Sequence, residues 1–299
     1  MQHVTVLKLE AINELNLNEG SVVVDCTLGA GGHAQEILER LSKRGVYIGI
    51  DADPTAIKAV KEKLSSYDAT VHLVNDNFKN LRTILDSFSL TSVDAIVADL
   101  GWRMEQFDGS SGLPRGFSFS SDEPLAMTFG EPKDYAFTAA DIINDWHEED
   151  IANVIYGYGQ DRFARRIARA IVKAREEQPI TTAKELGEIV YQAVPGFARH
   201  KRTHPATKTF QALRIAVNDE FDTLTTLIMD GFSSLRVGGR MAIISFHSLE
   251  DRIVKQAFKT LERDHLGVLV HKKPTTPSEA ELQANPRARS AKLRTIEKV

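Results

Sequence analysis

The sequence contains a single cysteine, Cys26, among 299 residues, so the chain cannot form an internal disulfide. This scarcity is typical of proteins in a reducing compartment, and we expect a cytoplasmic location. No apolar run approaches the roughly 18 residues that a membrane-spanning helix needs, so no membrane span is expected. Residues 1–5 lack the basic stretch followed by an apolar core that marks a secretory signal.

The chain also lacks net positive charge. Its formal net charge is −4 at pH 7. The chain as a whole therefore does not attract nucleic acid, and any such partner must be held by a local basic patch. The hydrophobic fraction of 42% is ordinary for a folded globular protein and argues against disorder.

The most informative stretch that is present is a short apolar run at residues 22–25, which ends in Asp25 and continues into a glycine-rich turn at residues 29–32. A helix is expected from about residue 34 to 41. Glycines let the backbone adopt positive φ and let a ligand come close. The free N–H groups of the helix that follows point at the same place, so this stretch predicts a cofactor site.

Three more apolar runs follow, at residues 45–51, 70–74 and 93–99, with helical patterns between them. Strands that alternate with helices predict an α/β fold whose mostly parallel sheet is covered on both faces. In such sheets, ligands bind beyond the carboxyl ends of the strands. The residues expected at those ends are Asp25, Asp51, Asp76 with Asn77 and Phe78, Asp99 and His247.

The alternation stops after Gly101 and resumes near Pro205. Residues 108–133 are rich in Gly, Ser and Pro and indicate a long loop, and helical patterns follow it. Because so long a loop is uncommon inside a compact domain, we predict a sheet domain of residues 1–101 and 206–299 with an inserted helical domain of residues 102–205. Helices are expected near residues 139–146, 149–156, 161–177 and 183–193, then one long helix from 205 through 228, a strand at 241–246 and last strands at 267–271 and 292–299.

The glycine turn matches the dinucleotide pattern G-x-G-x-x-A at Gly29, Gly31 and Ala34, with Asp51 about 20 residues further on to hold ribose hydroxyls. This pattern fits both NAD and S-adenosylmethionine, so an oxidoreductase is one alternative. Asp25 favours S-adenosylmethionine, because a carboxylate beside the turn would repel a pyrophosphate and attract an ammonium or sulfonium group. Phe78 is expected either to pack against an adenine ring or to be an ordinary core residue.

Asp99 is the candidate catalytic residue. Methyl transfer to an amine needs a nitrogen lone pair aimed at the methyl group, and a carboxylate that accepts from the N–H makes that pair more available. Asp99 could equally hold the cofactor, and the sequence leaves both roles open. The histidines show no metal-ligand spacing, so no metal is expected.

A local basic patch is the candidate surface for phosphate contacts with a nucleic acid, although charged helix faces are often only solvated. Five basic residues share one helical face, and a second cluster precedes Pro205. Lys208 and His247 complete the predicted RNA-binding set. The helical face carries Arg162, Arg165, Arg166, Arg169 and Lys173, and the cluster before Pro205 consists of Arg199, Lys201 and Arg202.

Motifs along nearly the whole chain resemble the bacterial 16S rRNA cytosine-N4 methyltransferase family (RsmH/MraW). The most specific are SFHSLEDR at residues 245–252 and HPATKTFQALRI at residues 204–215. The others are the stretch from Asp25 to His33, DLG at 99–101, RGFSF at 115–119, YGQDRFA at 158–164 and NPRARS at 285–290.

The resemblance implies a class I S-adenosylmethionine-dependent methyltransferase, Rossmann-like, with an inserted helical domain that recognises the substrate. It implies N4-methylation of a cytidine in the decoding centre, in the P-site region, of 16S rRNA in the small ribosomal subunit. The cofactor contacts that it implies are Gly31, Gly32, His33, Asp51, Phe78, Asp99 and Gln106, of which Gln106 rests on the resemblance alone.

The chain departs from the family pattern in the loop that should cover the target base. Trp102-Arg103-Met104 stands where the family usually has Val-Ser-Ser, and Ala126 and Thr128 replace an acid and a base. These changes bear on substrate positioning more than on cofactor binding, and they give some weight to an alternative, a non-catalytic RNA-binding factor of ribosome assembly that keeps the methyltransferase fold.

Overall fold

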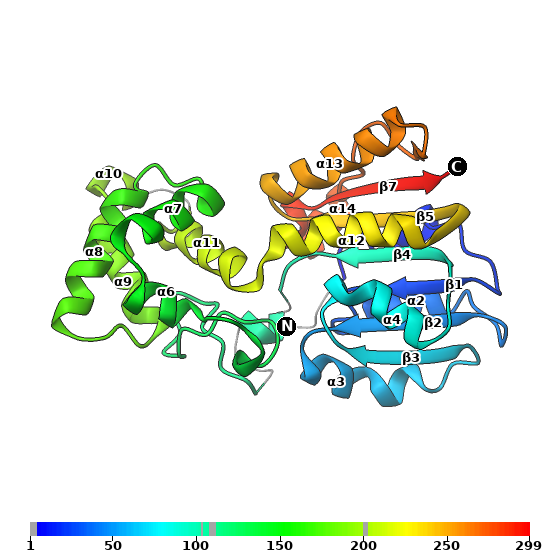
Figure 1. Cartoon of the computed structure of the whole chain (residues 1–299), viewed down its shortest axis with the longest axis horizontal. Coiled ribbons are helices and arrows are strands. Elements are labelled where there is room, and N and C mark those ends of the chain that lie inside the picture. Colours follow the sequence, from blue (N-terminus) through cyan, green and yellow to red (C-terminus); the bar gives the residue numbers. More distant parts are fainter. Residues whose placement is uncertain (1–4, 103, 108–111, 200–202) are drawn as a thin grey trace. The chain divides into compact units, whose positions relative to one another are not determined.

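The computed structural model describes residues 5–102, 104–107, 112–199 and 203–299. The chain divides into two compact units, which are coloured along the sequence in Figure 1. One unit combines Met1–Gly101 with Phe221–Val299, and we call it the sheet unit. The other, Trp102–Glu220, is the helical unit. Among the described residues, no helix is both long and apolar enough to cross a membrane.

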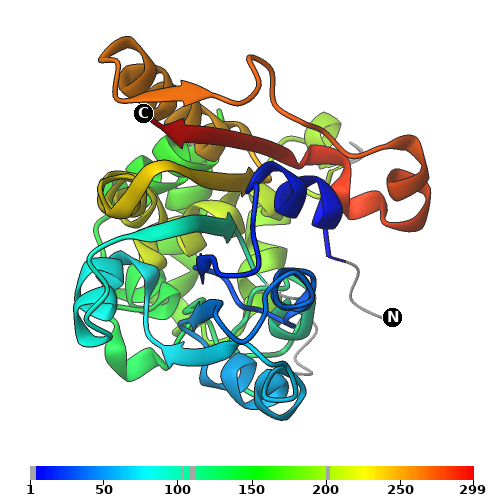
Figure 2. The ribbon, with the colours of Figure 1, turned by 90° about the vertical axis from the view of Figure 1, so that its right-hand side faces the viewer.

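The sheet unit contains a seven-stranded sheet in the order β3-β2-β1-β4-β5-β7-β6, and Figure 2 shows this order from β3 at the bottom to β6 at the top. The first five strands in that order are parallel, and β7 is antiparallel to both β5 and β6. The predicted mostly parallel α/β fold is therefore confirmed. The strands are β1 (Val22–Asp25), β2 (Val46–Asp51), β3 (Thr70–Asn75), β4 (Val93–Asp99), β5 (Leu235–Ser245), β6 (Gly267–Leu269) and β7 (Lys292–Lys298).

Both faces of this sheet are buried, as the continuous apolar runs of its strands require. Neighbouring residues of one strand point to opposite faces, so Val23 belongs to the core beneath the first three helices and Val24 to the core on the other face. The helices on the Val23 face are α1 (Lys8–Glu14), α2 (Gly32–Leu38) and α3 (Pro54–Leu64). The helices on the Val24 face are α4 (Leu81–Ser87), α12 (Glu220–Ser234) and α13 (Ser248–Arg263). The sheet unit also contains the short elements η1 (Phe78–Asn80), α14 (Glu279–Ala284) and η3 (Pro286–Ser290).

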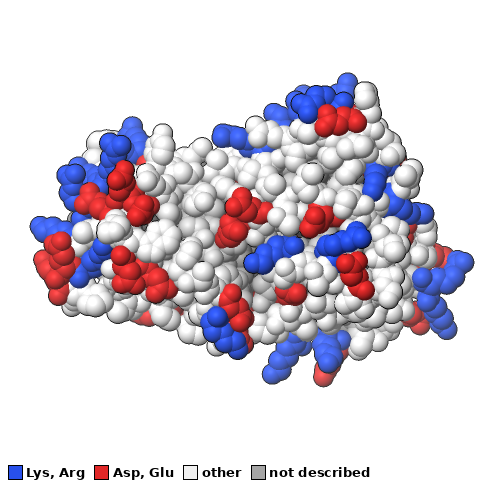
Figure 3. All heavy atoms as spheres, viewed as in Figure 1, with Lys and Arg blue, Asp and Glu red and all other residues white. Residues whose placement is uncertain are grey.

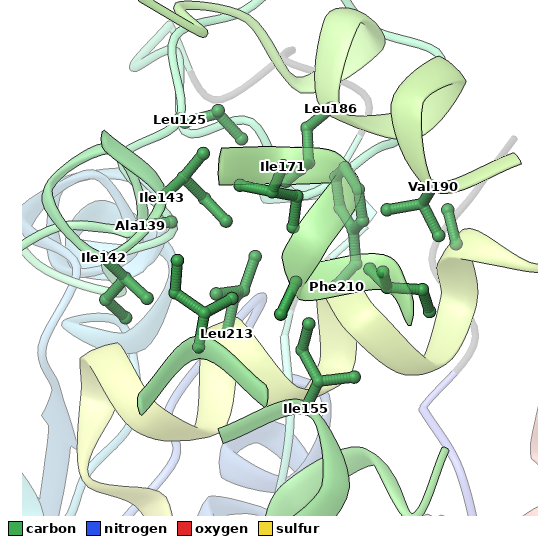
Figure 4. Packing of buried hydrophobic residues seen from close by; sticks show 14 of the residues in the cluster. Leu125, Ala139, Ile142, Ile143, Ile155, Ile171, Leu186, Val190, Phe210 and Leu213 are labelled. Carbon is green, nitrogen blue, oxygen red and sulfur yellow. The ribbon is translucent and has the colours of Figure 1, made fainter. Parts of the chain in front are cut away.

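The helical unit has a core of its own, in which aliphatic side chains from several helices meet around Phe210 and Leu213 (Figure 4). Two of its helices begin with reciprocal capping boxes, Thr138 with Asp141 and Thr182 with Glu185, which fix where they start. Its elements are α5 (Met104–Phe107), η2 (Pro132–Asp134), α6 (Ala139–Asp145), α7 (Glu148–Gly159), α8 (Ala164–Glu177), α9 (Ala183–Ala193), α10 (Gly196–Arg199) and α11 (Ala206–Asn218).

The long helix predicted from residue 205 through 228 is two helices, so that prediction is wrong. The first helix ends at Asp219, which adopts the left-handed conformation with φ 49°. A short polar residue tolerates that conformation, and the apolar spacing continues across it, which hides the break in the sequence. Because α11 packs in the helical core and α12 in the sheet core, residues 206–220 belong to the helical unit rather than to the predicted sheet domain.

Candidate functional site

Three acidic residues end three adjacent parallel strands. Asp25 ends β1, Asp51 ends β2 and Asp99 ends β4, with β1 between the other two strands. The hydrogen bonds between strands continue past these ends, from Cys26 N–H to the Val97 carbonyl at 2.9 Å. The structure thus brings together at one edge of the sheet the acids that the sequence predicted there.

The glycine turn has the backbone that its sequence predicts. Gly29 and Gly31 have φ values of 53° and 77°, which favour glycine, and Gly31 N–H donates to the Leu28 carbonyl at 2.8 Å. Asp51 holds this turn in place, because its Oδ2 accepts from Gly29 N–H at 2.8 Å. Its Oδ1 accepts from Asp53 N–H, also at 2.8 Å. Asp51 therefore ties the end of β2 to the turn after β1.

Gly32 is required by packing rather than by its backbone angle. A Cβ atom on Gly32 would lie 1.7 Å from Oγ1 of Thr5, far inside van der Waals contact. A residue of the N-terminal segment therefore packs directly against the start of α2, a contact that nothing in the sequence indicated. His33 follows within the helix and is buried.

Asp25 is almost completely buried, with 1% of its surface exposed. Its Oδ2 accepts from the hydroxyl of Tyr47 at 2.9 Å, and its Oδ1 accepts from Thr27 N–H at 3.1 Å. Burial raises the pKa of Asp25 to about 6; the two hydrogen bonds oppose this shift, and the Asp51 carboxylate adds to it. Tyr47 was not among the predicted site residues, although a tyrosine in a buried strand needs a partner for its hydroxyl.

Thr27 connects Asp99 to Asp25. Its Oγ1 accepts from Asp99 N–H at 2.6 Å, and its own N–H donates to Oδ1 of Asp25. The carboxylate Oδ1 of Asp99 is buried and accepts no hydrogen bond from any residue that the structure describes. Burial raises the pKa of Asp99 well above its usual range, and the nearby carboxylates of Asp25 and Glu250 raise it further. Asp25 and Asp99 have no cation from the described residues among their partners, and such carboxyl groups suit a positively charged ligand, because its charge would stabilise their ionised forms.

The residues after β3 shape their own loop. Asp76 Oδ1 accepts from Asn77 N–H at 2.7 Å and from the side-chain amide of Asn80 at 2.8 Å. Asn77 caps η1 by accepting from Lys79 N–H. Phe78 begins that turn, half-buried against the core on the α12 side of the sheet. Gln106, which only the resemblance indicated, is a buried residue of α5 in the helical unit.

The predicted basic helix face exists on α8 of the helical unit. Arg165, Arg166, Arg169 and Lys173 are exposed, as is Arg162 just before the helix. Only Arg169 of these has an acidic neighbour, with its Nε 3.6 Å from Glu148 Oε1, among the ion pairs between described residues. Figure 3 shows Lys and Arg side chains gathered at the α8 and α10 end of this unit, with acidic side chains beside them.

Two other predicted RNA-binding residues have structural partners. The Arg199 side chain donates to the carbonyls of Val194 and Gln192 at the end of α9. Lys208 Nζ donates to the Gln160 carbonyl at the end of α7, at 2.9 Å. Cations at helix ends of this kind satisfy carbonyls that the helix leaves open. The predicted residues Lys201 and Arg202, like Arg103, lie outside the described residues.

His247 caps α13. Its Nδ1 accepts from Glu250 N–H at 3.3 Å, and the Glu250 carboxylate accepts from the backbone N–H groups of Phe246 and His247. Ser248 and Asp251 have the same spacing one residue later, but the capping box is formed by His247 and Glu250. Asp251 instead pairs with Lys292 and Arg294 of β7, at 2.9 and 2.8 Å.

A mostly parallel sheet of this order, with a glycine turn after β1 and acids at three adjacent strand ends, defines a class I methyltransferase. The chain belongs to the MraW methylase family, whose model matches residues 1–299. It is 43% identical over 312 aligned residues to the "Ribosomal RNA small subunit methyltransferase H" of Clostridioides difficile, covering 99% of both chains. A protein of the same name from Brevibacillus brevis is also 43% identical, over 99% of this chain and 98% of the relative.

Among solved structures, an S-adenosylmethionine-dependent O-methyltransferase from Thermotoga maritima is similar with a TM-score of 0.44 and 10% identity, over 100% of this chain and 68% of that chain. The family and the sheet together confirm the predicted methyltransferase fold, methyltransferase activity and S-adenosylmethionine as the cofactor. Membership of a methylase family rules against the NAD-dependent oxidoreductase that the glycine pattern had left open.

Proposed function

We propose that this protein transfers a methyl group from S-adenosylmethionine to the exocyclic N4 of a cytidine in the decoding centre, in the P-site region, of 16S rRNA. The names of relatives that match over their whole length support a ribosomal RNA substrate. The observation that carries the proposal is the buried Oδ1 of Asp99, which no described residue satisfies, at a strand end beside Asp25.

The residues at the strand ends fit the cofactor. When bound, S-adenosylmethionine supplies an electrophilic methyl group on a sulfonium that leaves as a neutral thioether. In the proposal, the Asp25 carboxylate attracts the positive charge of the ligand. The Asp51 carboxylate, which already accepts from backbone N–H groups of Gly29 and Asp53, also accepts hydrogen bonds from the ribose hydroxyls. Phe78 packs against the adenine ring. The proposed cofactor set is Asp25, Gly29, Gly31, Gly32, His33, Asp51, Phe78, Asp99 and Gln106.

Asp99 orients the amine of the target base. The cytosine amine is a weak nucleophile because its lone pair is shared with the ring. Asp99 Oδ1 accepts from one N–H of this amine, which directs the lone pair away from that hydrogen and increases its electron density. A new N–C bond forms as the C–S bond breaks, and the nitrogen then gives up one proton to Asp99 or to solvent. The raised pKa of Asp99 makes its carboxylate a suitable acceptor for that proton.

The helical unit holds the RNA. Exposed arginines on α8 form a surface to which phosphate groups bind without sequence preference, so they position the substrate rather than select it. Arg199 and Lys208 contribute less in this proposal, since both already bind helix-end carbonyls. A cytoplasmic location, where ribosomal subunits assemble, stays a prediction.

Mass mapping of methylated cytidines in 16S rRNA, from cells with and without this protein, tests the proposal. We expect one N4-methylcytidine in the decoding centre that disappears without the protein and returns with the wild-type chain but not with Asp99→Ala. A methyl group at another atom or outside the decoding centre contradicts the proposed specificity.

The second candidate is a non-catalytic factor that binds the small subunit. The departures at Ala126 and Thr128 favour it, because both side chains are buried in the helical unit where the family has charged ones. The hydroxyl of Thr128 donates to the Gly130 carbonyl at 2.9 Å, so it is occupied within its own loop. Normal cofactor and subunit binding without any methyl incorporation supports this candidate.

A further inference from the structure

Phe197 is an aromatic side chain that the helical unit leaves 65% exposed. It lies on α10, a single turn between α9 and α11. Its ring meets Phe163 edge-on, with centroids 6.1 Å apart and an interplanar angle of 63°. Among the described residues, Phe163 therefore covers the ring only in part, and most of the Phe197 side chain faces solvent.

Arg162 covers part of this aromatic pair. Its guanidinium carbon lies 4.7 Å from the centroid of Phe163 and 5.5 Å from that of Phe197. A guanidinium stacked on rings keeps its N–H groups in its own plane, where they can still donate to a phosphate. No ion pair joins Arg162 to an acidic residue within the described part of the chain. The neighbouring Asp161 is buried and caps the backbone by accepting from Phe163 N–H at 2.8 Å.

The same region already contains stacked rings. Phe119 and His204 stack with centroids 4.2 Å apart at 7°, and Tyr191 lies 5.7 Å from His204 at 16°. Arg199, two residues beyond Phe197, lies over Tyr191 at 5.4 Å. Rings that alternate with guanidinium groups are the composition that single-stranded nucleic acid binds by base stacking.

We propose that the open face of Phe197 stacks on an unpaired base of the RNA substrate while Arg162 contacts the adjoining phosphate. This inference deepens the proposed function, from which it takes only the RNA nature of the substrate. Charge favours RNA over a protein partner, because Arg165 and Arg166 follow on the exposed face of α8. A ring flanked by cations in this way complements both the π-face and the charge of a nucleotide.

Binding of RNA oligonucleotides by the full-length chain, without methylation, tests this inference. The probe is a single-stranded oligouridylate that carries one 2-aminopurine, compared with the same strand paired to oligoadenylate. We expect Phe197→Ala to weaken single-strand affinity roughly tenfold to a hundredfold, and duplex affinity much less. Phe197→Trp should bind at least as well as wild type and should quench the 2-aminopurine fluorescence more strongly.

Phe197→Leu separates stacking from simple apolar contact, because leucine keeps much of the bulk without a π-face. We expect it to lose affinity as the alanine variant does. The matched control is Met229→Ala in the sheet unit, which truncates a side chain that is 56% exposed and should leave RNA affinity unchanged. Melting temperatures of all four variants establish that they are folded.

Two results overturn the inference: an affinity of Phe197→Ala within twofold of wild type, or full affinity in Phe197→Leu. The outcome is independent of the proposed reaction. If N4-methylcytidine forms normally while Phe197→Ala binds single strands like wild type, the stacking surface is wrong and the proposed function stands. If no methyl group is transferred while the binding differences appear, the activity is wrong and the stacking surface stands.

Discussion

The hydroxyl group of Tyr47 donates a hydrogen bond of 2.9 Å to Oδ2 of Asp25, and both side chains are buried between strands and helices. Since β1 and β2 are parallel neighbours, this bond joins two adjacent strands close to the edge that carries the candidate site. The bond holds one carboxylate oxygen in a fixed position. It does not supply the positive charge that a buried carboxylate requires, so the pKa of Asp25 is raised to about 6 in the folded chain.

We predict that Asp25→Asn raises the stability of the ligand-free protein above pH 6. The pKa of Asp25 is about 6 in the folded chain and 3.8 in the unfolded chain, so unfolding releases a proton between these pH values. The free energy of unfolding therefore falls as the pH rises through that window. The asparagine amide does not ionise, so the variant does not lose stability as the pH rises. At neutral pH its free energy of unfolding should exceed that of the wild type by up to about 3 kcal/mol. Urea unfolding at several pH values measures this gain.

The control for this prediction is the same comparison near pH 4, where the wild-type carboxyl is largely protonated and the two proteins should differ little. Asparagine can keep both contacts, since its carbonyl accepts from Thr27 N–H and its amide donates to the Tyr47 oxygen. If Asp25→Asn is less stable than wild type at neutral pH, burial of the ionised carboxylate is not what destabilises the wild-type protein.

Cofactor affinity should rise with pH between about 5 and 7. A cationic ligand favours the ionised form of Asp25, whose pKa of about 6 means that binding at lower pH must first displace a proton. Isothermal titration with S-adenosylmethionine should give roughly tenfold weaker binding for each pH unit below 6 and proton release that depends on the buffer. In Asp25→Asn we expect weak binding with little pH dependence; an unchanged pH profile in that variant would remove Asp25 from the cofactor site.

Asp99→Ala should lower the methyl-transfer rate by about 100-fold or more, the usual contribution of a positioned proton acceptor. Stability should not fall, because the substitution removes a buried carboxyl oxygen that no described residue satisfies. Single-turnover methylation and cofactor binding must be measured together. A large loss of binding with near-normal single-turnover rate at saturating cofactor would assign Asp99 to the cofactor rather than to the amine.

Charge reversal on α8, as Arg165→Glu with Arg166→Glu, should weaken RNA binding most at low salt. Each lost phosphate contact reduces the salt dependence of the affinity by about one unit in the slope of log K against log salt concentration. Filter binding from low to moderate salt measures this slope. Arg44→Glu in the sheet unit is the matched control, since Arg44 is also exposed yet lies outside the proposed surface. Equal slopes in all three proteins would eliminate the α8 surface.

Gly32→Ala should destabilise the protein by about 1–3 kcal/mol, the usual cost of overpacking, because the new Cβ meets Thr5. Thr5→Gly in the same chain makes room for that Cβ and should recover most of the loss. Gly157→Ala on α7 is the control, because no described residue outside its own stretch of helix comes within 4 Å of its Cβ position, and alanine favours a helix. Thermal unfolding of these three variants and of Thr5→Gly alone checks the cycle, and additive losses in the double variant would mean that Thr5 does not contact Gly32.

The sequence predicted the parallel strands and the positive φ of Gly29 and Gly31, because apolar runs that end in an acid and a glycine turn are local signals. It missed contacts between distant residues, such as Thr5 with Gly32 and Tyr47 with Asp25, since these depend on strand order and packing.

Sequence patterns also gave wrong predictions where the same pattern fits two different local structures. The apolar spacing of a single long helix continues through Asp219, although the residues on its two sides pack in different cores. At α13, both His247 and Ser248 have an acid three residues later, and side-chain contacts decide that His247 is the cap.

The continuity of the helical unit within the sequence has a consequence for synthesis. Strand β4 pairs with β5, and β5 with β7, but Trp102–Glu220 lies between β4 and β5 in the chain. The helical unit therefore leaves the ribosome whole while the sheet still lacks its last three strands. We expect it to fold first during translation, and its early folding shortens the effective loop that β4 and β5 must close. A released fragment of residues 1–220 should already protect the helical unit from protease, while β1 to β4 remain open to cleavage.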